Sequence, residues 1–438
     1  MKDSQLIPVE NMDIKLDDAT LLLKAKETGF MKRIRKFNPF DFIKALCLMT
    51  LYSTVSLEVF ATILGFVAGS CISKQSLWER ITPKCVAFVR SVLMSLMFRA
   101  SSLEPLTAKG AFSRFKRVLL QDSTTINLPE SLVRFFPGSG NQTGKVQAIM
   151  KIQVIHDLLS QTCLHFGLSG FRRNDQKASA DILNFARPGD LVIRDLGYFV
   201  LNIFRLFTRQ GIYFLTPYQH NVNYYTEDGE RLDLLKLLKK HPIVDTMIVA
   251  GATERLPVRL VASPVPANIA QIRRRKLLKK DRRSNPTKEQ LELLGWDIFL
   301  SNVGEDIWDS LTACRIYGIR WRIEILFKAW KSHFHFNSLP QKGSKSYIEL
   351  LVYSRLVFIT LFQSFFAEFS AYAYATEGKH LSLLKFAQFI QEHIWALILL
   401  FHSSQMPNLF LEQLLRHCAY ESRHERKNYH EKLSNFLT

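Results

Sequence analysis

Residues 317–331 read YGIRWRIEILFKAWK, and the spacing of polar and apolar side chains in this stretch is typical of an α-helix. At about 100° of rotation per residue, one narrow polar stripe forms from Tyr317, Arg320, Glu324 and Lys331. A separate apolar stripe, about a third of a turn away, consists of Ile319, Ile323, Leu326 and Trp330. We therefore expect one side of this helix to pack into a core, while the other presents a carboxylate between cations and a phenol. A surface helix with solvated charges is the alternative interpretation.

The region before this helix predicts an α/β core with a mixed sheet. Short apolar runs typical of strands alternate there with helical segments. The predicted strands cover 117–121, 151–158, 162–167, 191–193, 213–216 and 296–302. Ser160 and Gln161 turn the chain between the second and third of these strands, which predicts a hairpin. Helices are expected over about 176–186 and 198–209.

Two aspartates occupy positions where α/β sheets commonly place their chemistry. Asp122 follows the run 117–121, and Asp195 follows the run 191–193. Each alone is also explained as a turn or cap residue. Together with Glu324 they could hold two divalent ions about 3.5–4 Å apart, which is the arrangement used for phosphoryl transfer. Carboxylates favour Mg²⁺ or Mn²⁺. The other carboxylates of the region are interpreted as structural: Asp157, Asp175, Asp181 and Asp190.

The composition indicates a partner rich in negative charge. The chain of 438 residues has 58 Lys and Arg against 39 Asp and Glu, a formal net charge of +19, so nucleic acid is the expected partner. A basic run between residues 273 and 283 includes Arg273, Arg274, Arg275 and Lys276. We interpret it as a loop or an exposed helix end that contacts the phosphate backbone, with solvated charge as the alternative.

Composition also bears on compartment and membrane association. The six cysteines lie far apart without a CxxC pair, which fits a reducing cytoplasm. The apolar runs 45–57 and 350–366 are too short to span a bilayer, and Arg355 interrupts the second, so both are interpreted as buried helices. Near the N-terminus, helices capped by Ser56 and Ser73 form either a DNA-reading helix-turn-helix or an ordinary helical hairpin.

The residues match a known family at three places. Asp122 in LLQDSTT, Asp195 in VIRDLGYF and the Y-x2-R-x3-E-x6-K run from Tyr317 to Lys331 resemble the DDE transposases of bacterial insertion sequences. The pattern is most similar to the IS-four branch, which is defined by the Y-R-E-K signature. The resemblance covers about 113–340, and LGYF departs from the commoner Arg-Gly-Tyr or Arg-Gly-Phe context around the second aspartate.

The resemblance implies a ribonuclease-H-like catalytic core with a β-rich insertion between the second aspartate and the glutamate, flanked by helical N- and C-terminal regions. The expected organisation is a helical DNA-binding region, a core in two segments, an insertion and a helical C-terminal region: 1–110, 111–217 with 296–342, 218–295 and 343–438. The expected activity is that of a cut-and-paste DNA transposase, which cleaves the ends of an insertion sequence and joins them to target DNA. The alternatives are a nuclease that does not join strands and an inactive DNA-binding derivative.

By resemblance, Asp122, Asp195 and Glu324 are the expected ligands of two Mg²⁺ or Mn²⁺ ions. The expected contacts to the terminal phosphates come from Tyr317, Arg320 and Lys331. Trp321 and Trp296 are candidates for stacking on a flipped base, with core packing as the alternative for each. The expected partners are terminal inverted repeats and target DNA, bound by a homodimer in a synaptic complex. No membrane association is expected, and the enzyme would lie in the bacterial cytoplasm, with the nucleoid when bound.

Overall fold

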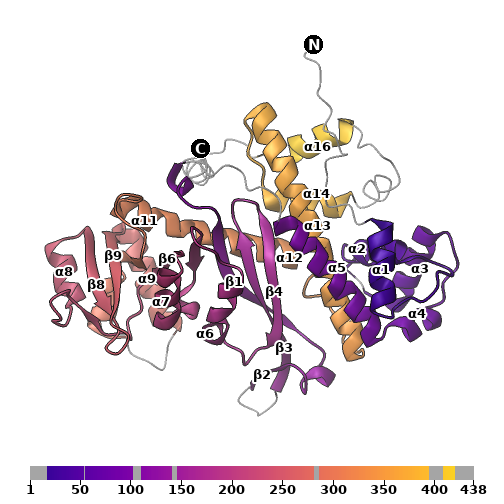
Figure 1. Ribbon diagram of the computed structural model, residues 1–438, viewed down its shortest axis with the longest axis horizontal. Coiled ribbons are helices and arrows are strands. Elements are labelled where there is room, and N and C mark those ends of the chain that lie inside the picture. The colour runs from indigo at the N-terminus through magenta and orange to yellow at the C-terminus, as the bar shows by residue number, and fades with distance from the viewer. Residues whose placement is uncertain are drawn as a thin grey trace.

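One mixed sheet of ten strands organises the fold and extends from the middle of the molecule to one of its ends (Figure 1). The computed structural model describes residues 17–53, 55–101, 110–140, 146–280, 286–393 and 408–419. The strands are β1 Val118–Asn127, β2 Pro137–Gly140, β3 Val146–Asp157, β4 Thr162–Gly170, β5 Leu191–Arg194, β6 Tyr213–Pro217, β7 Tyr224–Tyr225, β8 Val244–Ala250, β9 Leu256–Pro264 and β10 Trp296–Ser301. Their order is β2-β3-β1-β5-β6-β10-β9-β8-β7, and β4 also pairs with β3.

Five of the strands from the segment that was expected to form the core lie in the order β4-β3-β1-β5-β6. Strand β3 is antiparallel to both β1 and β4, so the predicted hairpin is confirmed. Strands β1 and β5 are parallel, as are β5 and β6. This mixture of antiparallel and parallel pairing agrees with the expected ribonuclease-H-like core.

The segment between the second aspartate and the glutamate continues this same sheet. Strand β10 is antiparallel to both β6 and β9, and β8 and β7 extend the sheet further. Helices accompany these strands: α8 Leu234–Lys240, α9 Ala267–Lys280 and α10 Lys288–Leu293. The insertion therefore contributes helices as well as strands, and it shares its backbone hydrogen bonding with the core.

Strand alternation divides the interior into two hydrophobic cores, one on each face of the sheet. Val118 and Leu120 of β1 and Ile193 of β5 belong to the first core. Leu119 and Val192, one residue out of phase, belong to the second. Each strand thus sends alternate side chains to opposite layers of helices.

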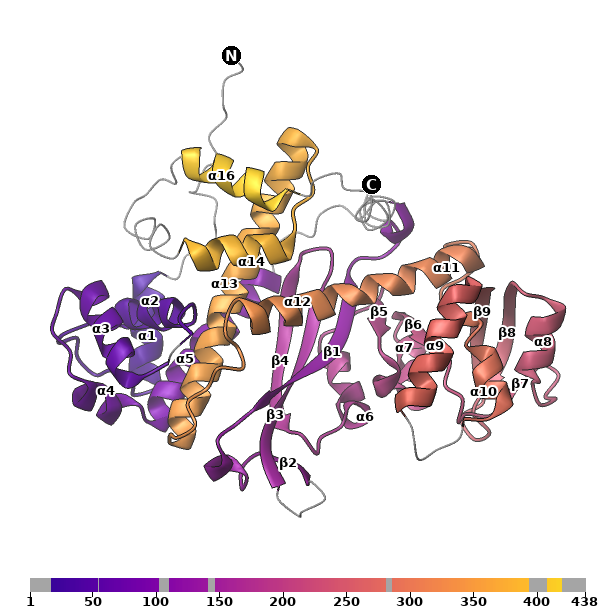
Figure 2. The ribbon, with the colours of Figure 1, turned by 180° about the vertical axis from the view of Figure 1, so that it is seen from behind.

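The first face carries helices from both halves of the chain, and α11 and α12 cross the strands in Figure 2. They include α5 Pro83–Ser101, α11 Ser310–Ile316, α12 Trp321–Ser332 and α13 Lys345–Glu377. The second face is covered by shorter helices, including α6 Asp175–Ala178, α7 Leu201–Arg209 and α8. This layering decides which side chains of the strands can meet α12.

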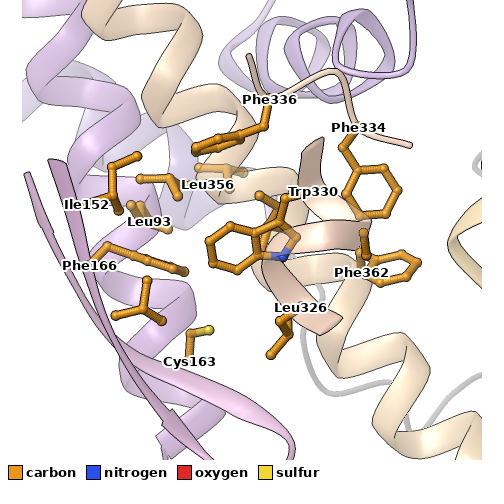
Figure 3. Packing of buried hydrophobic residues seen from close by; sticks show 14 of the residues in the cluster. Leu93, Ile152, Cys163, Phe166, Leu326, Trp330, Phe334, Phe336, Leu356 and Phe362 are labelled. Carbon is orange, nitrogen blue, oxygen red and sulfur yellow. The ribbon is translucent and has the colours of Figure 1, made fainter. Parts of the chain in front are cut away.

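Trp330 anchors α12 to the first face (Figure 3). Its side chain is fully buried, and its ring centroid lies 6.0 Å from that of Phe166 in β4 and 5.7 Å from that of Phe336. The apolar stripe predicted for this helix is confirmed, because Ile319, Ile323, Leu326 and Trp330 are all buried. Burying a large aromatic ring of this kind contributes about 1.5–3 kcal/mol or more, so the position of α12 is firmly fixed.

The N-terminal helices pack at the opposite end of the molecule from β8 (Figure 1). They are α1 Asp18–Glu27, α2 Pro39–Met49, α3 Leu57–Ala68 and α4 Lys74–Arg80. Both predicted caps are confirmed, because the Ser56 side chain accepts from the Val59 amide and the Ser73 side chain accepts from the Ser76 amide. Helices α14 Leu383–Glu392 and α16 Asn408–Cys418 complete the described C-terminal part, and the expectations for 1–16 and 420–438 lie outside the described residues.

Helix α13 is long and apolar enough to cross a membrane, but it forms part of the first core. In its most apolar 18-residue window, 72% of the helix is buried inside the protein. Arg355 is 2% exposed and donates to the backbone oxygens of Phe336 and Ser338, at 3.3 and 2.8 Å. A buried guanidinium needs such hydrogen-bond partners, and the protein supplies them, so α13 is a helix of the protein core.

Two local expectations were wrong. Strand β1 continues five residues beyond Asp122, because Asp122 to Asn127 pair with β3. The stripe helix is two elements, since Tyr317–Arg320 is a 3-10 helix and α12 begins at Trp321; Gly318 is a poor α-helix former. The described part of the basic run, residues 273–280, forms the C-terminal half of α9, which agrees with the helix-end interpretation, and residues 281–283 lie outside the described residues.

The buried His156 of β3 predicts a specific sensitivity to acid. Burial, reinforced by the nearby charge of Arg322, lowers the pKa of His156 to about 3. The unfolded chain binds this proton below pH about 6.5, so stability is complete above that pH and is lost as the pH falls, by up to about 1.4 kcal/mol per unit. We expect His156→Met to reduce the drop in melting temperature between pH 7 and pH 5. His241→Gln, at an exposed position, is the control, and an equal drop in both variants would contradict this account.

Candidate active site

Asp122 faces the layer that contains α12. It lies on β1 in phase with Val118 and Leu120, whose side chains belong to the first core. Its carboxylate accepts the Ser123 amide at 2.7 Å and the Arg320 Nη1 donor at 3.2 Å. The side chain is 18% exposed, so this carboxylate is held at the edge of the core and remains accessible from one side.

Asp195 reaches the same side from the neighbouring strand. It directly follows β5, in phase with Ile193 of the first core, and the residue is exposed. The residue precedes the 3-10 helix Leu196–Tyr198, but its side chain accepts no capping hydrogen bond there. The cap interpretation therefore does not account for this carboxylate.

Glu324 enters from α12, and Arg320 joins it to Asp122. The Arg320 guanidinium donates through Nη1 to Asp122 and through Nη2 to Glu324 Oε1. The Arg320 side chain is 16% exposed, so both ion pairs are shielded from water. Two carboxylates that are about 200 positions apart in the chain are thus brought to one guanidinium.

The charges of both Asp195 and Glu324 affect the pKa of Asp122. The pKa of Asp122 is raised to about 6, chiefly by burial and to a smaller extent by the charges of Asp195 and Glu324. The Ser123 amide and the Arg320 charge oppose this shift. A carboxylate whose pKa is raised by burial and by neighbouring carboxylates is a candidate for a functional site.

The donor set suits a hard divalent ion, although the carboxylates are not yet gathered around one. Within the described ranges, His, Cys, Asp and Glu side chains form no group of three or more that could hold a metal as they stand. Arg320 takes up the space between Asp122 and Glu324 and supplies the positive charge there. Three carboxylates without a soft ligand fit Mg²⁺ or Mn²⁺, provided that Arg320 gives up its contacts.

The other residues of the polar stripe surround this group. The Tyr317 ring packs against Phe299 of β10 with centroids 4.6 Å apart, and the Arg320 guanidinium lies 5.8 Å from the Tyr317 centroid. Burial raises the pKa of Tyr317, so its phenol stays protonated. Lys331 is half-buried, and burial lowers the pKa of its ammonium group.

The two tryptophan candidates occupy different surroundings. Trp321 is 56% exposed on α12 beside Arg320. Trp296 is partly buried against the second core, in phase with Ile298 and Leu300, and so lies on the face of the sheet away from α12. Phe299 is the β10 ring that faces the candidate site. Of the two tryptophans, Trp321 combines exposure with proximity to the carboxylates.

The basic run separates into two groups along α9. Arg273 pairs with Asp297 at 2.7 Å, and Arg274 donates to the Leu291 backbone oxygen at 2.9 Å. Arg275, Lys276 and Lys279 are exposed. Helix α9 lies beside α11 on the face of the sheet that carries α12 (Figure 2). The helix that bears these cations is thus on the same face of the sheet as α12.

Lys328 is an exposed cation that was not predicted as a site residue. It follows Glu324 by four residues and Trp321 by seven, so it lies within about 20° of Trp321 around the helix. This helical spacing in the sequence could have identified Lys328 as a cation on the same exposed face as Trp321. The other nearby carboxylates are engaged structurally; Asp190, for example, pairs with Arg117.

Comparison with known proteins shows the family to which the chain belongs. The family model described as a transposase DDE domain matches residues 113–347, which is more than half of the chain. The chain therefore belongs to the transposase DDE domain family, and it is an enzyme that cleaves and transfers DNA.

Similar curated proteins extend the likeness over most of the chain. The transposase for insertion sequence element IS231F of Bacillus thuringiensis subsp. israelensis is 27% identical over 419 residues, covering 89% of this chain and 86% of its own. The IS231D transposase of Bacillus thuringiensis subsp. finitimus is 29% identical, covering 85% and 82%. The IS1151 transposase of Clostridium perfringens is 22% identical, covering 84% and 82%.

The division of α9 yields a test of DNA binding. Replacing Arg275, Lys276 and Lys279 by alanine should flatten the dependence of log binding constant on log salt concentration by up to about 2.7, or about 0.9 for each phosphate that is no longer neutralised. Arg273→Ala is the matched control, because it removes a cation engaged with Asp297. It should leave the slope nearly unchanged and cost about 0.2–1 kcal/mol of stability. An unchanged slope in the triple variant would mean that these charges are only solvated.

Proposed function

We propose that the chain is a cut-and-paste transposase in which Asp122, Asp195 and Glu324 hold two divalent ions, Mg²⁺ or Mn²⁺. The observation that carries this proposal is the convergence of the three carboxylates from β1, the end of β5 and α12 on one face of the sheet. Bound ions would activate the attacking hydroxyl and stabilise the leaving oxygen of an in-line displacement. The chain's own contribution is to fix the three ligands on rigid elements, which keeps them aligned at little entropic cost.

Arg320 has two successive partners in this proposal. Without DNA, its guanidinium neutralises Asp122 and Glu324. A phosphate group of DNA offers the same planar guanidinium a bidentate partner. Transfer of Arg320 from the carboxylates to a phosphate would free the ligands when the substrate is in place, so DNA binding and metal binding support each other.

The neighbouring residues complete the grip on the DNA end. Tyr317, protonated and packed against Phe299, can donate its phenol hydrogen to a phosphate oxygen. Lys331 adds a cation about two helical turns after Glu324 on the same stripe. Trp321 offers an exposed ring for stacking on an unpaired base. We assign the stacking role to Trp321 alone, since Trp296 would have to leave the second core.

The partners follow from charge and geometry. The exposed cations of α9 and the net charge of +19 favour the phosphate backbone of the terminal inverted repeats and of target DNA. The N-terminal helices up to residue 110 are proposed to add a second DNA contact. Cutting and joining two ends requires two active sites, so a homodimer in a synaptic complex is proposed. In the cell, such an enzyme would lie with the nucleoid.

Replacement of Glu324 tests the assignment of the ligands. Glu324→Gln should lower metal-dependent cleavage of DNA that carries the flanking inverted repeats by more than about 100-fold, because an amide is a poor ligand for a hard cation. DNA affinity should stay within about threefold, since the fold is intact. Glu349→Gln, which removes the carboxylate of a helical pair with Lys345, is the matched control. Cleavage at the normal rate by Glu324→Gln would remove Glu324 from the site.

Replacement of Arg320 tests the exchange of partners. Arg320→Gln should bind Mn²⁺ more tightly than the natural chain when DNA is absent, by roughly tenfold, because the competing cation is gone. It should also cleave DNA more slowly, because glutamine cannot pair with the phosphate as a guanidinium does. Titration calorimetry measures the first effect, and Arg315→Gln at an exposed position of α11 is the control. Unaltered Mn²⁺ affinity in Arg320→Gln would contradict the exchange.

A further inference from the structure

A buried polar cluster lies directly behind the candidate ligands, on the opposite face of the sheet. Ser123 follows Asp122 on β1, so its side chain points to the second face. There the Asp175 Oδ1 atom accepts three hydrogen bonds: from Ser123 Oγ at 2.9 Å, Lys151 Nζ at 3.1 Å and Gln153 Nε2 at 3.0 Å. Asp175 was expected to be an ordinary structural carboxylate, but its partners lie on β1, which bears Asp122, and on the neighbouring strand β3.

The same cluster reaches the segment that carries Asp195. The Tyr198 hydroxyl donates to Gln153 Oε1, and Tyr198 is three residues after Asp195. A Cβ atom placed on Gly197 would lie 3.4 Å from Asp175 Cβ and Oδ2, so this turn is packed closely against Asp175. Asp175 therefore contacts Ser123, which follows Asp122, and packs against Gly197, two residues after Asp195.

The strength of these contacts sets the cluster apart from a surface ion pair. Lys151, Gln153 and Tyr198 are 7%, 1% and 1% exposed. Removal of the Asp175 carboxylate would leave a buried ammonium without its partner, which is costly. The Asp175 side chain is 28% exposed, but its donors Lys151 and Gln153 are buried, and charge-assisted hydrogen bonds from buried donors hold geometry more firmly than those between two exposed groups.

We propose that Asp175 is a positioning residue that holds Asp122 and Asp195 in register through Ser123 and through the Gln153–Tyr198 pair. The path is continuous, because the Ser123 amide also donates to Asp122 Oδ1 at 2.7 Å. Fixing the Ser123 hydroxyl from behind fixes this amide, and the amide orients the carboxylate in front. Asp175 itself does not touch the reacting atoms. The proposal rests on the proposed roles of Asp122 and Asp195 as ligands.

Ser123→Ala is the sharpest variant, because it cuts the link to β1 and leaves the Lys151–Asp175 pair in place. We expect it to increase the exchange rate of the Ser123 amide hydrogen, to lower cleavage by about 10–100-fold and to raise the Mn²⁺ concentration needed for half-maximal cleavage. Asp175→Asn keeps the acceptor oxygen without the charge and should show a partial effect of the same kind. Thr125→Val, at the next position on the same side of β1, is the matched control and should behave as the natural chain.

The proposal would be overturned if both Ser123→Ala and Asp175→Asn kept the exchange rate of the residue-123 amide hydrogen and the Mn²⁺ dependence of cleavage that the natural chain shows. So would equal changes in Thr125→Val, because these would indicate general loosening of β1. Amide exchange is measured without DNA or metal, so it tests the hydrogen bond even if the proposed activity is wrong. Failure of the proposed function would appear separately, as absent metal-dependent cleavage by the natural chain.

Discussion

The burial of α12 against the alternating side chains of β1 and β5 is the constraint on which the site depends. Alternation sends Asp122 and Asp195 to the face where Val118, Leu120 and Ile193 form the first core. Trp330 fixes the helix on that same face. Glu324 then meets Asp122 as a consequence of packing, with no need for local attraction between the carboxylates. Repulsion among them is offset by Arg320, which lies four residues before Glu324.

The two faces of the sheet contribute differently to the site. The first face gathers charge that the fold cannot fully satisfy by itself, as the raised pKa of Asp122 indicates. The second face surrounds Asp175 with hydrogen-bond donors from the middle of β1 and β3, of which Lys151 and Gln153 are buried. The unfavourable grouping of charges on one face is thus supported by a hydrogen-bonded network on the other. Proteins commonly maintain unfavourable functional groups by such compensation elsewhere in the fold.

Much of this arrangement was predictable, and the limits have physical causes. The three carboxylates, the apolar stripe of α12 and the order of strands and helices follow from spacing and periodicity. The length of β1 did not, because Ser123, Thr124 and Thr125 resemble a turn until β3 provides their pairing. The Arg320 bridge joins segments 198 positions apart, which no local pattern reports. Likewise, the face occupied by Trp296 depends on how β10 pairs with β9.

Because the sheet continues through β10, the catalytic core and its insertion are not separated by a structural boundary. Strand β10 is hydrogen bonded to β6 on one side and β9 on the other. Excision of residues 218–295 would turn β10 into an unprotected edge and uncover apolar side chains that Leu238, Ile248 and Leu260 now cover. A shortened enzyme made in this way would be prone to aggregate, so the smallest stable form of this protein includes the insertion.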